Sequence, residues 1–170
     1  MELLKLATIW AKSEVFSTRF FIFFAIGFDV AGFLFWRFGK TDLAKAYIYP
    51  SSVSGLLLLA IGLGLFYTNK SRIIQFKKEF RTDSTSFYQS EIERTESTLK
   101  EYTVVFKVIP ILIIIAALLI LFIDTPTWRA SSITAIAMLI IILLVDGTAH
   151  ARIEKYNKEL KMLDIEIKNE

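Results

Sequence analysis

The sequence predicts an all-α fold: a polytopic membrane protein whose four transmembrane helices extend into a cytoplasmic helical bundle. Hydrophobic residues make up 54% of the 170-residue chain and the mean hydropathy is +0.51, which is more apolar than an ordinary soluble domain. Four apolar runs approach the roughly 20 residues that a helix needs to cross about 30 Å of hydrocarbon. The charged residues fall mainly between these runs, in segments whose apolar residues still recur with a helical period.

The four apolar runs pair into two hairpins. They cover residues 20–38, 47–67, about 104–123 and about 128–145. The connections within each pair are short, so the two helices of a pair are predicted to be antiparallel neighbours. Aromatic residues lie near the ends of the runs, as in the aromatic belts of membrane proteins: Trp36, Tyr47, Tyr49, Tyr67, Tyr102 and Trp128. Before the fourth run, Asp124 offers an N-cap and Pro126 fits the first helical position.

The pattern divides the chain into five segments. They are an N-terminal interfacial helix (1–15), a first transmembrane hairpin (16–68), a cytoplasmic helical hairpin (69–103), a second transmembrane hairpin (104–149) and a C-terminal cytoplasmic helix (150–170). In the first segment Leu3, Leu6, Ala7 and Trp10 share one helical face, which predicts a helix lying in the membrane surface with Trp10 at headgroup depth. The alternative is a frayed tail.

The basic residues predict the orientation. Sixteen of the 20 Lys and Arg residues lie before the first run, between the second and third runs, at the inner start of the third (Lys107), or after the fourth. The other four are Arg37, Lys40, Lys45 and Arg129. The positive-inside rule therefore predicts a multi-pass protein of the plasma (bacterial inner) membrane with both termini in the cytoplasm.

The segments outside the membrane carry helical stripes. Ile153, Tyr156, Leu160, Leu163 and Ile167 recur at spacings of three and four, as in the seam of a coiled coil. Such a seam either joins copies of the chain or packs inside a bundle formed by one chain. The middle segment has two stripes of the same kind: Ile73, Phe76 and Phe80, then Tyr88, Ile92, Leu99, Tyr102 and Phe106. Residues 81–86 between them predict a turn, and Ser86 followed by Gln89 predicts a capping box.

Two matching segments indicate an internal repeat. Thr68, Arg72, Ile73 and Phe76 align with Thr148, Arg152, Ile153 and Tyr156, each set following the second helix of a membrane hairpin. Both copies enter from the cytoplasm, so the repeat would be parallel, unlike the inverted repeats of many transporters. The alternative is that two basic amphipathic helices leaving a membrane resemble each other by chance.

Asp29 is the first candidate for an ion or proton site. It lies near the middle of the first apolar run, where a charged side chain costs at least about 2.5–3.5 kcal/mol. Its carboxylate is expected to face the bundle interior or water. The structural alternative is a polar contact with the serines that begin the second run, Ser51, Ser52 and Ser54.

Asp146 and His150 are the second candidate. They stand one helical turn apart at the inner end of the fourth run, so they share a helix face. A proton relay is one hypothesis, and a hydrogen-bonded cluster that orients the helix exit is the other. His150 is the only histidine and there is no cysteine, so the sequence predicts no metal site and no cofactor.

Nothing in the sequence matches an enzyme: no nucleophile stands beside a base, and there is no phosphate-binding loop. The architecture resembles that of small four-span bacterial proteins such as toxin immunity proteins and membrane components of anti-phage systems. Three hypotheses follow. The first is a non-enzymatic homo-oligomeric membrane assembly, either a pore or an anchoring and signalling component. The others are a small proton- or ion-coupled transporter using Asp29, and a toxin-immunity protein acting in the membrane.

The expected partners are the lipid bilayer, further copies of the chain and a cytoplasmic protein. Direct nucleic-acid binding is not expected, because the net charge of +3 is explained by the cytoplasmic flanks of the membrane helices.

Overall fold

The chain is almost entirely helical. A computed structural model describes the backbone of residues 1–169 and the side chains of residues 1–163. The helices are, in order, α1 (Glu2–Phe38), α2 (Asp42–Ala46), α3 (Ile48–Thr82), α4 (Ser84–Phe122) and α5 (Pro126–Asn169). Four of these helical segments are long and apolar enough to cross a membrane. The predicted all-α fold with four spanning-length helices is therefore confirmed.

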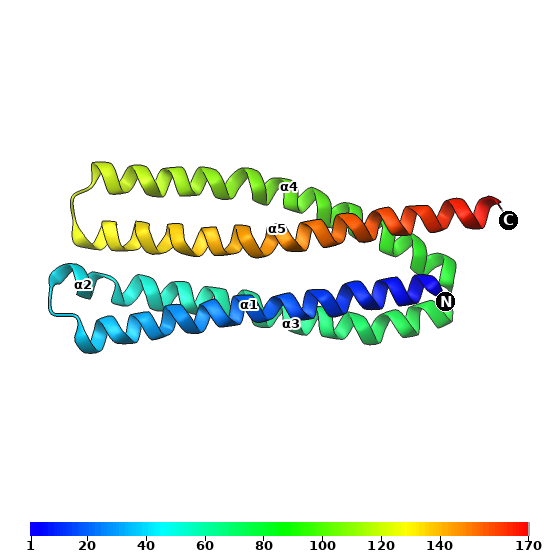
Figure 1. The fold of residues 1–170 in the computed structure, drawn as a ribbon, viewed down its shortest axis with the longest axis horizontal. Coiled ribbons are helices and arrows are strands. Elements are labelled where there is room, and N and C mark those ends of the chain that lie inside the picture. The colour runs from blue at the N-terminus through cyan, green and yellow to red at the C-terminus, as the bar shows by residue number, and fades with distance from the viewer. Residues whose placement is uncertain (170) are drawn as a thin grey trace.

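The long helices form two antiparallel hairpins that lie side by side (Figure 1). Helices α1 and α3 make one hairpin, joined through the short α2, and helices α4 and α5 make the other. Both chain ends and the α3–α4 turn lie at the same end of the molecule, opposite the two hairpin tips. We call the parts of the four helices at that end, residues 2–18, 69–103 and 150–163, the polar bundle, and the remainder the apolar half.

Local residues explain where the helices begin. The Thr41 side chain accepts a hydrogen bond from the Ala44 amide at 3.1 Å and caps α2. The carboxylate of Asp83 accepts from the amides of Thr85 and Ser86 at 2.9 and 3.1 Å and caps α4. The predicted capping box at Ser86 is wrong, because only Asp83 has the extended backbone of an N-cap and Ser86 already lies in the first turn. Helix α5 begins at Pro126, as predicted.

The N-terminal segment is not a separate interfacial helix. Helix α1 runs without interruption from Glu2 through the first apolar run, and Ala7, Trp10 and Ala11 are buried in the polar bundle. The apolar face that predicted a membrane-surface helix packs against protein instead. Sequence alone does not separate the two outcomes, since both require the same one-sided pattern.

The core of the polar bundle is formed within one chain. Its buried residues come from all four long helices: Ala7, Trp10, Ala11, Phe76, Phe87, Ile153, Tyr156 and Leu160. The two stripes predicted in the middle segment pack against it through Ile73, Phe80, Tyr88, Ile92, Leu99 and Tyr102. The seam residues Ile153, Tyr156 and Leu160 are thus used inside the bundle and are not free to join copies. Leu163 is partly buried, and the side chain of Ile167 lies outside the described residues.

Glycines let α1 and α3 approach closely in the apolar half. Gly32 lies against Ser52, Gly55 against Asp29, and Gly62 against Phe21. A Cβ atom at Gly55 would stand 3.0 Å from the carbonyl oxygen of Ala25 on α1, and backbone atoms cannot turn aside. Because glycine has no side chain, α1 and α3 can pack this closely only where the glycines face the other helix. The glycines therefore fix the register of the hairpin.

Replacing Gly55 with alanine should therefore destabilise the hairpin, because overpacking of a close contact costs about 1–3 kcal/mol. Gly64→Ala is the matched control: it lies on the same helix, and a Cβ there would meet nothing within 4 Å. We expect a lower midpoint of thermal unfolding for Gly55→Ala in detergent and an unchanged or higher one for Gly64→Ala, since alanine favours helix. Equal midpoints would contradict the close packing of α1 on α3.

Candidate functional site

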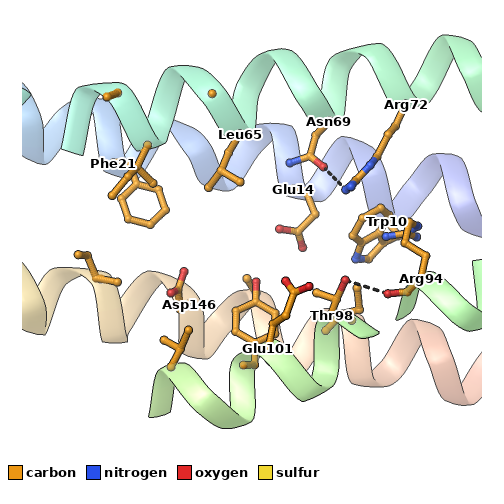
Figure 2. A pocket seen from close by; sticks show the side chains of 18 residues that line it. Trp10, Glu14, Phe21, Leu65, Asn69, Arg72, Arg94, Thr98, Glu101 and Asp146 are labelled. Carbon is orange, nitrogen blue, oxygen red and sulfur yellow. Dashed lines mark hydrogen bonds between the residues drawn. The ribbon is translucent and has the colours of Figure 1, made fainter. Parts of the chain in front are cut away.

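A cavity of about 550 Å³ opens between the two hairpins, where the polar bundle meets the apolar half (Figure 2). All four long helices contribute to it, and we call it the inner cavity. Its charged and amide side chains are Glu14 of α1, Asn69 and Arg72 of α3, Arg94 and Glu101 of α4, and Asp146 of α5. The site therefore depends on both hairpins, and a volume of this size is typical of small-molecule sites.

The charges of the inner cavity are ordered along the molecule. Phe21 and Asp146 lie toward the apolar half, whereas Trp10, Arg72 and Arg94 lie toward the polar bundle, with Glu14 between them (Figure 2). Among the charged residues labelled in Figure 2, Asp146 therefore lies closest to the apolar half, and Arg72 and Arg94 lie closest to the polar bundle.

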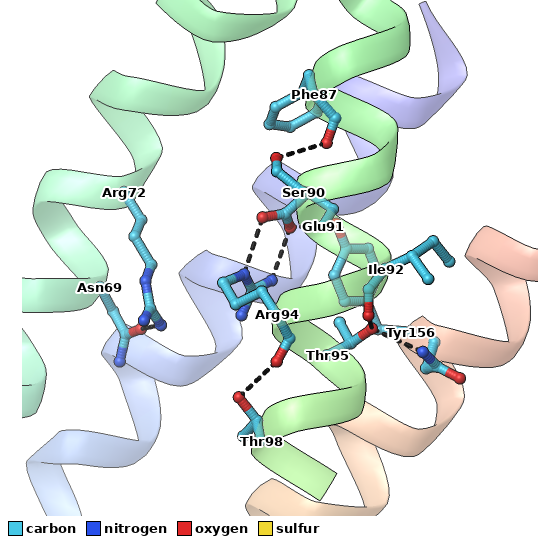
Figure 3. Close-up of polar contacts among 11 residues, drawn as sticks. Asn69, Arg72, Phe87, Ser90, Glu91, Ile92, Arg94, Thr95, Thr98 and Tyr156 are labelled. Carbon is cyan, nitrogen blue, oxygen red and sulfur yellow. Dashed lines mark hydrogen bonds and ion pairs between the residues drawn. The ribbon is translucent and has the colours of Figure 1, made fainter.

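One wall of the cavity is held by a buried ionic network (Figure 3). The Arg94 guanidinium donates to both carboxylate oxygens of Glu91, at 2.8 and 2.6 Å, and the Tyr156 hydroxyl donates to the same carboxylate at 2.7 Å. Glu91 is only 3% exposed. Burial, together with the negative charge of Glu91, raises the pKa of Tyr156, so this hydroxyl stays protonated and keeps donating.

Aromatic contacts complete this wall. The Trp10 ring stacks on Tyr156 at 5.4 Å, and the Arg94 guanidinium carbon lies 4.2 Å from the centre of the Trp10 ring. Beside them, the Asn157 amide donates to the Thr95 hydroxyl at 2.6 Å, which ties α5 to α4. The Trp10 indole nitrogen and Arg94 Nη1 are buried without a hydrogen-bond partner among the described residues.

An ion pair also connects the two hairpins at this level. Arg152 of α5 donates to both carboxylate oxygens of Glu14 on α1, at 2.9 and 3.3 Å. Arg72, at the matching position of the sequence repeat, instead donates to the Asn69 side chain at 3.1 Å. Burial and the nearby positive charge of Arg94 lower the pKa of Arg72 from its usual value.

An apolar cluster borders the inner cavity on the side of the apolar half. Its buried members are Phe21, Ala25, Leu58 and Val145, with Phe24, Phe28, Leu59, Met138, Ile141 and Ile142 packed around them. Beyond it, near the hairpin tips, lies an outer cavity of about 710 Å³ that Asp42, Lys45, Ser54 and Ser131 help to line. Phe21 borders both the cluster and the inner cavity, and Met138 borders both the cluster and the outer cavity. The cluster therefore stands between two partly polar hollows.

The structure separates the residues predicted for an ion or proton site. Asp146 lines the inner cavity. His150 packs edge-on against the rings of Tyr102 and Phe106, at 5.6 and 5.4 Å, and is not part of the cavity lining. Asp29 is half-buried against Gly55 between α1 and α3, and lines neither the inner nor the outer cavity.

The residues that sequence reasoning missed are Glu14, Glu91 and Arg94. Each lies in an ordinary charged helical segment, so no local pattern distinguishes it from a solvated surface residue. For Arg72 the sequence contained one indication of a role, its alignment with Arg152 in the internal repeat. Both arginines lie at the interface between the hairpins.

Within the described part of the chain, no three His, Asp or Glu side chains are close enough to hold a metal ion. Comparison with known proteins found no family model, no curated protein and no solved structure that matches this chain.

Proposed function

We propose that the protein is a non-enzymatic, four-span membrane protein that works as an oligomeric assembly with a gated path between its two hairpins. The polar bundle lies in the cytoplasm, on the side predicted by the sixteen basic residues. The observation that carries the proposal is the apolar cluster around Leu58, which borders the inner cavity through Phe21 and the outer cavity through Met138.

An apolar constriction between two hydrated cavities is a physical barrier to ions, because water leaves a narrow apolar passage and an ion cannot enter without its hydration shell. The Phe21, Ala25, Leu58 and Val145 side chains supply such a barrier. The polar bundle holds the hairpins together at one end through Glu14–Arg152 and the Glu91 network. Movement that opens the path is then expected between the apolar halves of the hairpins.

Packing of α4 supports an assembly of several copies. Only 6% of the most apolar stretch of α4 is buried within the chain, compared with 22–28% for the other three spanning segments. Its outward residues, such as Val108, Ile111, Leu112 and Ile115, are apolar and exposed. This outward apolar face of α4 is the surface at which we place neighbouring copies.

Replacing Leu58 with asparagine should open a leak, because a polar side chain lets water into the constriction. Leu58 is fully buried, whereas Leu56 on the same helix is 61% exposed on the outward side, so Leu56→Asn is the matched control. We expect ion flux from liposomes to rise at least about tenfold with Leu58→Asn and to stay at background with Leu56→Asn. Equal flux for the two variants would count against a gate at this cluster.

A transporter coupled through Asp29 is the competing hypothesis. It predicts that Asp29→Asn abolishes proton- or ion-coupled transport. A gate at Leu58 instead predicts that adding Asp29→Asn to Leu58→Asn leaves the ion leak unchanged. The number of copies is measured separately by native mass spectrometry in lipid nanodiscs. A strictly monomeric protein there would remove the oligomeric part of the proposal.

A further inference from the structure

We propose that the inner cavity is a binding site for a small, water-soluble zwitterion, whose anionic group is held at Arg72 and whose ammonium group is held at Asp146. The inference goes beyond the gated path, since it concerns what occupies the cavity in the closed state. It rests on two half-buried charges of opposite sign that line the same cavity and form no ion pair within 4 Å among the described side chains.

Arg72 is the unpaired positive charge. Its hydrogen-bond acceptor in the structure is the neutral amide of Asn69, and no carboxylate among the described side chains lies within 4 Å of it. It is half-buried, and its guanidinium carbon lies 5.9 Å from the Trp10 ring centre. A guanidinium has five N–H donors in a fork that fits a carboxylate or a phosphate, so most of its binding capacity is unused.

Asp146 is the unpaired negative charge. It is half-buried at the opposite end of the cavity, where Phe21, Val105 and Ile142 also form the lining. No basic side chain in the described part of the chain lies within 4 Å of its carboxylate. A partly desolvated carboxylate without a partner is unfavourable, and an ammonium group is a chemical match for it.

The other strong charges of the cavity are already neutralised or solvated. Glu14 is paired with Arg152, and Arg94 is paired with Glu91. Glu101 is exposed and therefore hydrated. A simple anion would leave Asp146 without a direct ion-pair partner, and a simple cation would leave Arg72 without one, since Glu14, Glu91 and Glu101 act on Arg72 only through space. A ligand that carries both charges compensates both in one binding event.

The order of the charges favours a soluble zwitterion over a lipid headgroup. In a phosphatidylethanolamine the phosphate stands next to the acyl chains and the ammonium lies farther from them. In the cavity the carboxylate stands closer to the apolar half and the arginine farther from it, which is the reverse (Figure 2). The ligand is therefore expected to enter from the cytoplasmic side with its ammonium group first.

The test is calorimetric titration of the full chain in phosphatidylcholine nanodiscs. The probes are two zwitterions, γ-aminobutyrate and ε-aminocaproate, and the singly charged butylamine and butyrate. We expect at least one zwitterion to bind about tenfold or more tightly than either singly charged probe. Arg72→Gln should remove the preference over butylamine, and Asp146→Asn should remove the preference over butyrate.

Three controls keep this test decisive. Arg72→Lys and Asp146→Glu retain the charges and should retain the preference, while Lys155→Gln, at a side chain that is 78% exposed, should change nothing. Equal affinity for zwitterions and singly charged probes, or no measurable binding, would overturn the inference. Loss of zwitterion binding when phosphatidylethanolamine replaces part of the phosphatidylcholine in the nanodisc would overturn it in favour of a lipid headgroup. None of these results bears on the Leu58→Asn leak, so the two proposals fail independently.

Discussion

Replacing Glu91 with alanine is expected to lower the free energy of unfolding by about 3–5 kcal/mol, the usual cost of breaking a buried ion pair. The carboxylate is 3% exposed and accepts hydrogen bonds from both Arg94 and Tyr156. Its removal leaves a guanidinium and a hydroxyl buried without their acceptor. The loss can be measured by equilibrium unfolding in mixed detergent micelles, followed by the helical circular dichroism signal.

Glu96→Ala is the matched control for Glu91→Ala. Glu96 lies on the same helix and pairs with Lys161 of α5 at 2.7 Å, but both side chains are about half exposed. Water replaces an exposed partner, so we expect no measurable change in unfolding for Glu96→Ala. The loss in free energy of unfolding for Glu91→Gln should lie between those of the two alanine variants, because the glutamine amide oxygen still accepts hydrogen bonds but carries no charge. If Glu91→Ala and Glu96→Ala lowered the free energy of unfolding by the same amount, that would contradict a stabilising role for the buried network.

Leu160→Ala is expected to cost about 2–5 kcal/mol without changing the mass of the assembly. Leu160 is fully buried in the polar bundle, on the stripe that was predicted either to join copies or to pack within a bundle. The structure uses it within one chain, so truncation leaves a cavity inside the protomer. Unfolding is measured as for Glu91, and the mass by native mass spectrometry.

Met162→Ala is the control for Leu160→Ala, because Met162 lies two residues away and is 56% exposed. It should alter neither stability nor mass. Dissociation of the assembly by Leu160→Ala with no loss of protomer stability would mean that this seam joins copies after all.

The sequence predicted the helices well because each carries its own signal. Apolar runs of spanning length, proline at position 126 and stripes such as Phe76 with Phe80 are local patterns, and the structure contains the corresponding helices. The interfacial placement of residues 1–15 was wrong for a physical reason. An amphipathic helix buries its apolar face against lipid or against protein, and Trp10 suits both surroundings.

The site was harder to predict than the fold. Asp29 stood out because a charge inside an apolar run is costly, and Asp146 stood out because it shares a helix face with His150. The partners that define the inner cavity, Glu14 with Arg152 and Glu91 with Tyr156, come from helices far apart in the chain. Their meeting depends on how the two hairpins are aligned, and a single sequence contains no local record of that alignment.

Cysteine accessibility tests the closed path between the hairpins most directly, and the chain has no native cysteine to interfere. Gly64→Cys places a thiol in the inner cavity, Ser131→Cys in the outer cavity, and Leu58→Cys in the apolar cluster. With a membrane-impermeant thiol reagent, we expect Gly64→Cys to react only from the cytoplasmic side, Ser131→Cys only from the outer side, and Leu58→Cys from neither. Labelling of Leu58→Cys in the resting protein, or of Gly64→Cys and Ser131→Cys from the same side, would contradict two cavities separated by an apolar gate.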